Sequence, residues 1–338
     1  MSRFTRFAWL VLLYNLAVVA WGAFVRATGS GAGCGRHWPM CNGVVVPRAP
    51  STATLIEFSH RLTSGLALLL VVAMAAWAFR VFPRRHVVRR AAAASVVLIL
   101  TEALIGAGLV LLELVAHDAS LRRAVALPAH LVNTFFLLAA LALTAWWSRT
   151  VPRERTGAVV RLRGQGGAGA LVAGSLVGTL LLGVTGAVTA LGDTLFPAGS
   201  LAEGVRQDFA PTAHFLLRLR IWHPTLALGV GAIVLGAAGV VWLTREGEAT
   251  RRFAGAVVLL FAAQLVAGVT NLLLLAPVWM QLVHLLLADV LWIALVLLAA
   301  STAAVARLGA RPGELESAAS AAAPRGDGST REVVPAGR

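Results

Sequence analysis

Four histidines fall inside apolar segments of this sequence, at positions that repeat between its two halves. Imidazole is costly to bury in hydrocarbon, so a histidine in such a segment is a candidate functional residue. The alternative for any single one is a packing residue whose ring is hydrogen-bonded, but four at repeated places favour ligands. The sequence therefore predicts two metal or haem sites, ligated by His60 and His130 in the first half and by His223 and His284 in the second.

The repeat extends beyond the histidines to their neighbours. Four segments of the first half recur in the second: Glu57-Phe-Ser-His60 as Arg220-Ile-Trp-His223, Pro128-Ala-His130-Leu as Leu282-Val-His284-Leu, Glu102-Ala-Leu-Ile-Gly106 as Gln264-Leu-Val-Ala-Gly268, and Gly22-Ala-Phe-Val as Gly186-Ala-Val-Thr. Glu102 and Gln264 are interpreted as polar residues that bond across helices rather than as catalytic groups.

Glu57 lies three residues before His60, so the two share one face of a helix. Its counterpart in the second half is Arg220, and this asymmetry predicts a reactive site in the first half and a plain cofactor site in the second. The alternative for Glu57 is an interfacial carboxylate paired with Arg61. Arg61, Arg218 and Arg220 lie beside the histidines, where guanidinium groups could bind haem propionates or extend toward lipid headgroups.

Cys34 and Cys41 are the only cysteines and lie in one short segment rich in turn-forming residues. Outside the cytoplasm a disulfide is the default state of such a pair, either as a structural link or as a redox-active pair, and the sequence leaves both open. Their spacing is not that of a zinc site or of covalent c-type haem attachment.

The elements that must position these residues are membrane-spanning helices. The chain is 58% hydrophobic and 13% charged, whereas a soluble domain carries about 25% charged residues, so soluble classes are excluded. The net charge of +14 does not indicate nucleic acid, because the arginines cluster between apolar runs. A spanning helix needs roughly 20 apolar residues, and eight segments qualify: 8–26, 55–80, 89–112, 124–147, 168–191, 216–243, 253–275 and 279–305.

Arginine-rich connections alternate with longer or more acidic ones, which indicates an orientation by the positive-inside rule. Both termini are expected in the cytoplasm, and the loops at 27–54, 113–123 and 192–215 outside. With no Arg/Ser-rich transit segment before the first apolar run, we expect a prokaryotic inner membrane. The halves share one orientation, so an approximate two-fold axis runs along the membrane normal.

The predicted fold is an all-α integral membrane protein with eight spanning helices in two four-helix bundles. Its expected domains are a first bundle at 1–148, a cytoplasmic linker at 149–167, a second bundle at 168–308 and a disordered cytoplasmic tail at 309–338. All four histidines then fall in the outer third of their helices, which is the geometry of axial ligation inside a four-helix bundle.

Several motifs of the first half together resemble the haem A synthase family: Val25-Arg26-Ala-Thr28-Gly29-Ser30-Gly31, Cys34, Trp38-Pro39, Cys41 and Glu57-x-x-His60-Arg61. The resemblance covers about residues 8–305, and the second half matches more loosely through Gly186, His223-Pro224 and His284. It implies an enzyme that oxidises a ring methyl of haem O to a formyl group by successive hydroxylations, giving haem A for terminal oxidases.

The resemblance also implies roles for individual residues. His60 and His130 would line the site of the substrate haem O, with Glu57 implicated in the reaction. His223 and His284 would ligate a haem B cofactor that passes electrons. The cysteine pair would match a disulfide of one bacterial subgroup, whereas a second pair that some relatives carry is missing from residues 192–215.

Two other classes of protein would use the same histidines. A two-haem membrane cytochrome would only move electrons between quinone and an outer acceptor, and it would need neither the Glu57/Arg220 asymmetry nor the cysteine motif. A haem transporter would bind haem exchangeably without altering it. For a synthase, the expected partners are haem O and haem A, the lipid bilayer, haem O synthase, an electron donor and a second copy of the chain.

Overall fold

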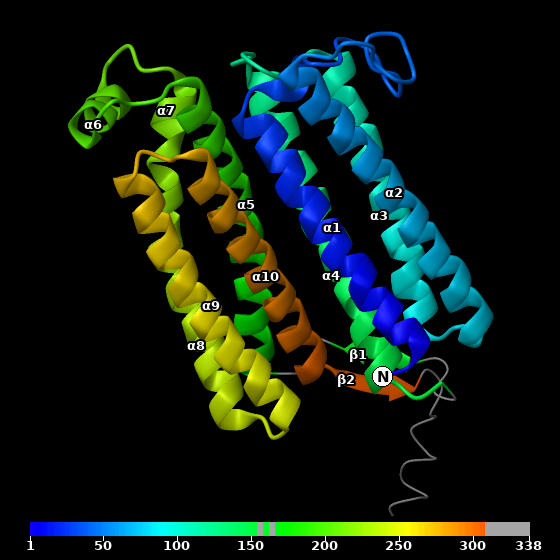
Figure 1. Cartoon of the computed structure of the whole chain (residues 1–338). Helices are drawn as coiled ribbons and strands as arrows, with labels where there is room; N and C mark the ends of the chain where they lie inside the picture. The colour runs from blue at the N-terminus through cyan, green and yellow to red at the C-terminus, as the bar shows by residue number, and fades with distance from the viewer. Residues whose placement is uncertain (154–157, 162–165, 308–338) are drawn as a thin grey trace, which may run out of the picture.

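The computed structural model describes residues 1–153, 158–161 and 166–307, and its described part is almost entirely helical (Figure 1). Its elements are α1 Arg3–Ala27, η1 Ser30–Ala32, α2 Thr52–Val81, α3 Val87–Leu111, α4 Leu121–Thr150, β1 Ala158–Arg161, α5 Gly166–Leu195, α6 Leu201–Phe209, α7 Phe215–Arg220, α8 Trp222–Thr244, α9 Glu248–Leu273, α10 Val278–Thr302 and β2 Ala304–Arg307. Among these residues eight spans are long and apolar enough to cross a membrane, with α7 and α8 counted as one. The prediction of a multi-pass, all-α membrane protein is therefore confirmed.

The spans form two groups of four. Helices α1 to α4 pack around one another, and α5, α8, α9 and α10 do the same. Figure 1 shows the groups side by side, with α4 next to α5 and α10 at the boundary. Within each group the helices associate through close side-chain packing and interhelical hydrogen bonds, because lipid tails are as apolar as leucine and provide no hydrophobic driving force.

Serine caps begin the two first-half helices that carry histidines. The side chains of Ser51 and Ser120 accept hydrogen bonds from the backbone N–H groups of Thr54 and Arg123. Such caps satisfy N–H groups that have no partner in the first turn of a helix. They define where α2 and α4 begin, and therefore the depth of His60 and His130 below those ends.

The sixth predicted span is present as one membrane-crossing segment, Phe215–Thr244. Its helix is interrupted at a single residue, Ile221, between α7 and α8. Pro224 explains the break, because a proline ring clashes with the carbonyl four residues earlier, here that of Arg220. The hydroxyl of Thr189 on α5 donates to this carbonyl at 3.5 Å, so the interrupted turn regains a partner.

Two further features differ from the sequence prediction. The loop at 192–215, which was predicted to lie outside, contains the short helix α6. Within the predicted linker, β1 pairs antiparallel with β2, which lies where the last span was expected to end. The rest of the linker prediction at 154–157 and 162–165, and the predicted disordered tail at 309–338, lie outside the described residues.

The largest hydrophobic cluster of the described residues spans the boundary between the two groups of helices. The rings of Phe135 on α4 and Trp292 on α10 stack with their centroids 5.3 Å apart. The indole N–H of Trp292 donates to the backbone carbonyl of Phe135 at 2.6 Å, so a buried polar group is satisfied across the boundary. This contact joins the helices that carry His130 and His284, one from each half.

Candidate functional site

Each of the four repeated histidines lies against a glycine of a neighbouring spanning helix. A Cβ atom added to Gly22, Gly186 or Gly268 would lie 2.9, 3.0 or 3.1 Å from Cε1 of the facing imidazole. The first distance is shorter than real Cβ contacts and the other two are tighter than nine in ten of them, so the ring would have to shift by a few tenths of an ångström. The four pairs are Gly22 with His60, Gly106 with His130, Gly186 with His223 and Gly268 with His284.

Gly106 differs from the other three glycines. Its added Cβ would lie 3.7 Å from Nε2 of His130, an ordinary van der Waals contact. The sequence repeat had indicated these glycines as equivalent positions without indicating what they face. The structure shows that they leave room for an imidazole, which a packed helix pair otherwise fills with side chains.

The second-half histidines face each other across the space between α8 and α10. The ring centroids of His223 and His284 are 6.3 Å apart, and the ring planes are nearly perpendicular at 86°. Two imidazoles that ligate one metal from opposite sides, each with a bond of about 2 Å, have ring centres about 6 Å apart. The pair therefore fits a haem iron between the rings.

Polar side chains from adjacent helices contact these two rings. The hydroxyl of Thr185 lies 3.1 Å from Nδ1 of His223, and Nε2 of Gln264 lies 3.3 Å from Nε2 of His284. Nδ1 of His284 is buried without a hydrogen-bond partner among the described residues. A buried ring nitrogen without a partner is costly, so a ligand would satisfy what the protein leaves open.

The first-half histidines show the same pattern with a different partner. Nδ1 of His60 is buried and has no hydrogen-bond partner in the described chain. Nδ1 of His130 lies 3.3 Å from Oε1 of Glu102 on α3. That carboxylate also accepts hydrogen bonds from Asn133 and Thr134 on α4. The expected cross-helix bonding of Glu102 is present, and it includes a candidate ligand that the sequence did not associate with it.

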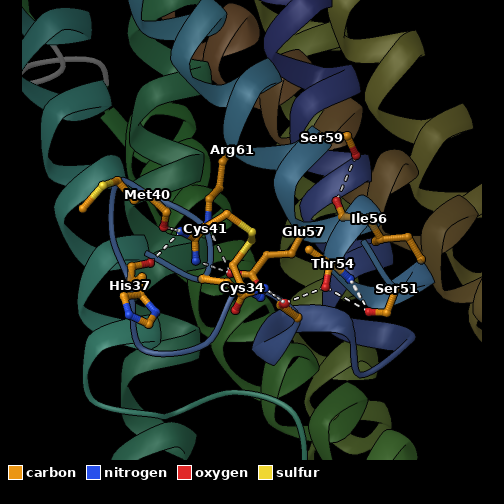
Figure 2. The surroundings of a disulfide bond; sticks show 12 residues. Cys34, His37, Met40, Cys41, Ser51, Thr54, Ile56, Glu57, Ser59 and Arg61 are labelled. Carbon is orange, nitrogen blue, oxygen red and sulfur yellow. Dashed lines mark hydrogen bonds and ion pairs between the residues drawn. A yellow bond between two sulfur atoms is a disulfide. The ribbon is translucent and has the colours of Figure 1, made fainter. Parts of the chain in front are cut away.

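Glu57 lies under the disulfide loop near the N-terminal end of α2 (Figure 2). Its side chain is buried and forms an ion pair with Arg61, one turn further along α2. The other carboxylate oxygen accepts a hydrogen bond of 2.8 Å from the backbone N–H of Cys34. The pairing with Arg61 considered from the sequence is thus present, and Glu57 also contacts the loop that carries the cysteines.

Arg61 also binds this loop, as Figure 2 shows. Its Nη1 donates to the backbone carbonyls of His37 and Met40, both at 2.6 Å. Cys34 and Cys41 form a disulfide within this loop. Glu57 and Arg61, which flank His60 on α2, therefore both bind the loop that the disulfide closes.

The second half replaces that arrangement with an arginine between acidic groups. Arg220 forms ion pairs with Asp193 at the end of α5 and with Asp208 on α6. It also donates to the backbone carbonyl of Gly204. The pKa of the Asp208 carboxyl is raised above its usual value, because the effect of burial exceeds the opposing effect of Arg220. Arg220 thereby links α6 to the end of the second bundle where α5 ends and α8 begins.

The remaining histidines have other surroundings. His86 and His214 cap α3 and α7 through their Nδ1 atoms. Within the described residues no group of three or more His, Cys, Asp and Glu side chains could hold a bare metal ion. The histidine pairs thus suit a group that brings its own equatorial ligands, as haem does.

Asp289 is a buried acid that the sequence analysis did not single out. It lies on α10, five residues after His284, and is fully buried. Neither carboxylate oxygen has a hydrogen-bond partner in the described part of the chain. Its signal in the sequence is a lone acid inside an apolar run, which marks a functional candidate in a membrane span.

Arg26 is the second residue whose contacts the sequence did not indicate. It lies on α1, yet its guanidinium donates to the carbonyl of Ala190 and the hydroxyl of Thr194 on α5, both at 2.9 Å. It also donates to Gln281 on α10 at 2.7 Å. These bonds join the first bundle to the second at the outer end, one turn from His284.

Comparison with known proteins shows one family and two kinds of named relative. The model of the COX15-CtaA family, described as cytochrome oxidase assembly protein, matches residues 5–296. A Thermus thermophilus protein named protoheme IX farnesyltransferase is 51% identical over 268 residues, 79% of this chain and 43% of that protein. Proteins named heme A synthase from Shouchella clausii and Alkalihalophilus pseudofirmus are 46% and 42% identical over 95 residues, 28% of this chain and 32% of each relative. The matched region is thus less than half the length of each relative.

Proposed function

The chain belongs to the COX15-CtaA family of cytochrome oxidase assembly proteins, and we propose that it is a membrane oxidoreductase that converts haem O to haem A. In this reaction a ring methyl of haem O becomes a formyl group through successive hydroxylations. Relatives named heme A synthase support the proposal. The structural observation that carries it is the pair of imidazoles in each half, above all His223 and His284 at 6.3 Å.

The second half is proposed as the site of the haem B cofactor. His223 and His284 would hold its iron, and Gly186 and Gly268 give the rings the room that this position requires. Bound there, haem would supply one-electron transfer. Arg220 is a candidate for a propionate, although it already pairs with two acids.

The first half is proposed as the site of the substrate. His60 and His130 would orient haem O with a ring methyl toward the outer end of α2. Glu57 would hold a fixed negative charge one turn from His60, and a proton transferred during oxidation could be accepted there. The loop closed by the disulfide and fastened by Arg61 would cover this end and keep water out.

The proposed placement in the cell follows from the arginine distribution. Both termini and the basic connections would lie in the cytoplasm of a prokaryote, with the disulfide loop and α6 outside. The ends of each bundle that carry the histidines would then face outward. Four-helix bundles at 1–148 and 168–308 would form the two haem domains.

The name of the Thermus thermophilus relative suggests a second candidate function, farnesyl transfer to protohaem. More than half of that relative lies outside the matched region, so the name need not describe the part that this chain resembles. A farnesyltransferase acting on protohaem produces the farnesylated haem that the proposed reaction consumes. We therefore infer that a haem O synthase is a partner, together with an electron donor.

The test is the haem content of the purified protein, expressed in a host that makes haem O. Acid-acetone extraction and chromatography should find haem A, or its hydroxylated intermediate, beside haem B. Haem B alone, despite available haem O, would favour an electron-transferring cytochrome. Conversion of protohaem to haem O with added farnesyl diphosphate would favour the farnesyltransferase.

Two variants then test the assigned residues. Glu57→Gln should abolish conversion while both haems remain bound, because it removes the charge and keeps the shape. Full conversion by this variant would remove Glu57 from the reaction. Arg252→Ala, which removes one partner of an exposed ion pair on α9, is the matched control and should convert haem O normally.

A further inference from the structure

Glu102 and Gln264 occupy equivalent positions in the two halves, four residues before Gly106 and Gly268. Each reaches from one helix to a candidate ligand histidine on the next. Oε1 of Glu102 lies 3.3 Å from Nδ1 of His130, and Nε2 of Gln264 lies 3.3 Å from Nε2 of His284. A carboxylate therefore lies beside Nδ1 of the histidine in the first half, whereas in the second half an amide lies beside the other ring nitrogen, Nε2.

The surroundings of Glu102 are built to hold a carboxylate. Asn133 and Thr134 donate to its two oxygens from α4. Thr101 in turn donates to the amide oxygen of Asn133 at 2.7 Å, which orients that amide. Within the described residues no arginine pairs with Glu102, and the basic side chain beside it is the imidazole of His130.

The second half lacks the groups that would hold such a charge. The positions equivalent to Asn133 and Thr134, three and four residues after the histidine, are Leu287 and Ala288. Neither side chain can donate a hydrogen bond. A carboxylate at position 264 would thus be buried without its donors, which is costly, and the neutral amide of Gln264 avoids that cost.

Partners of a ligating imidazole change the metal as well as the ring. A carboxylate raises the basicity of the ring and fixes its orientation. A more basic ligand donates more electron density, and such hydrogen bonding is one of the means by which a protein sets the potential of haem. The amide of Gln264 brings no charge, and it contacts Nε2 of His284 and leaves Nδ1 without a partner among the described residues.

We propose that Glu102 is a positioning residue that makes the first-half haem site the more electron-rich of the two, while Gln264 keeps the second-half site neutral. The contact orients Nε2 of His130 toward the haem and adds a fixed negative charge behind the ring. This rests on the proposed function, in which the first half performs the oxidation and the second passes electrons. The position of the carboxylate then identifies the oxidising half independently of Glu57.

Reciprocal substitutions test the proposal. Redox titration of the protein purified with both haems gives one midpoint potential for each. Glu102→Gln should raise the potential of one haem and leave the other unchanged. Gln264→Glu should lower the potential of that other haem. A structural role in helix packing would not shift the two haems in opposite directions.

Thr134→Val is the matched control, because it removes a hydrogen bond from the same network but keeps the carboxylate. It should shift the potential less than Glu102→Gln does. An equal shift would mean that packing of the network sets the potential, and it would overturn the proposal. Unchanged potentials in both swapped variants, with both haems retained, would overturn it as well.

The outcomes separate this inference from the proposed function. Wild-type protein that contains haem A but shows unchanged potentials in the variants refutes the role of Glu102 alone. Wild-type protein without haem A whose potentials shift as expected refutes the synthase and keeps the role of Glu102. If Glu102→Gln is recovered without haem, Glu102→Asp decides, because it keeps the carboxylate: haem retained in that variant supports the charge effect, and haem lost there refutes it.

Discussion

The two halves of the molecule share one framework and differ in the charges placed on it. In both, a glycine on one helix makes room for an imidazole on the next. Near the histidines, the first half pairs Glu57 with Arg61 under a disulfide loop, whereas the second pairs Arg220 with two acids under α6. On the proposed function, the repeat would determine where haem binds, and single polar substitutions would determine what each haem does.

The strongest way to break this comparison is to remove one ligand from one half. His223→Ala should lose the second-half haem and keep the first, so that haem per chain falls by about half, because an iron with one missing imidazole is held by the other alone. Haem quantified against protein measures this. His117→Ala, in an exposed loop, is the control. Unchanged haem content in His223→Ala would end the assignment of the second site.

The next largest effect is expected where the halves meet. Arg26→Ala removes three hydrogen bonds from a buried cation, and bonds to charged groups contribute about 1.5–3 kcal/mol each without adding fully. We expect a destabilisation of about 3 kcal/mol, measured by thermal unfolding in detergent. The repeat equivalent of Arg26 is Ala190, so the second half has no such anchor. An unchanged unfolding temperature would show that the apolar core alone joins the halves.

The disulfide lies in the first-half loop, whereas the corresponding loop of the second half contains α6 and no disulfide among the described residues. Cys34→Ser opens a short covalent loop, which should cost about 2–3 kcal/mol of stability. Proteolysis should then cut the loop near Asn42 faster, while the region around α6 is cut as before. Equal acceleration at both places would show that the disulfide stabilises the whole protein rather than one loop. Serine is nearly the size of cysteine, so packing changes little.

The smallest effects should come from substituting the four glycines. These variants compare the two halves most directly, because the same change is made at equivalent positions. Gly22→Ala, Gly186→Ala and Gly268→Ala force the imidazole to move, at about 1–3 kcal/mol. We expect roughly tenfold weaker haem binding for each, since 1.4 kcal/mol is a factor of ten. Gly106→Ala meets His130 only at 3.7 Å and should bind haem nearly as well as wild type. Haem titration of apoprotein measures all four.

A larger loss for Gly106→Ala than for the other three would contradict the geometry. It would mean that haem bound to His130 approaches α3 more closely than the ring does. The four variants thus act as controls for one another, because each makes the same chemical change at an equivalent position.

Much of the fold could be predicted from hydropathy, and the errors lie where hydropathy carries no information. The eight spans were found because a membrane requires long apolar runs. Helix α6 was missed because it is short, with apolar residues on one side only and polar ones between them. The break at Ile221 was missed because α7 and α8 are both apolar, although Pro224 indicated it.

The site was predicted in part. The repeat identified all four histidines and the facing glycines as equivalent positions, yet their mutual contacts came from the structure. Glu57 and Arg61 are four residues apart, so their pairing was visible in the sequence. The approach of Glu102 to His130 was not, because that distance depends on how α3 and α4 are rotated and staggered.

The sequence by itself determined that the chain spans a membrane, that it consists of two similar halves and which histidines are equivalent. These properties depend on local hydrophobicity and on spacing along one chain. Only the tertiary structure decided that His223 and His284 face each other, that Arg26 reaches into the other half and that Glu102 lies behind His130. Those contacts join helices far apart in sequence, and their geometry follows from side-chain packing between helices, which no linear pattern encodes.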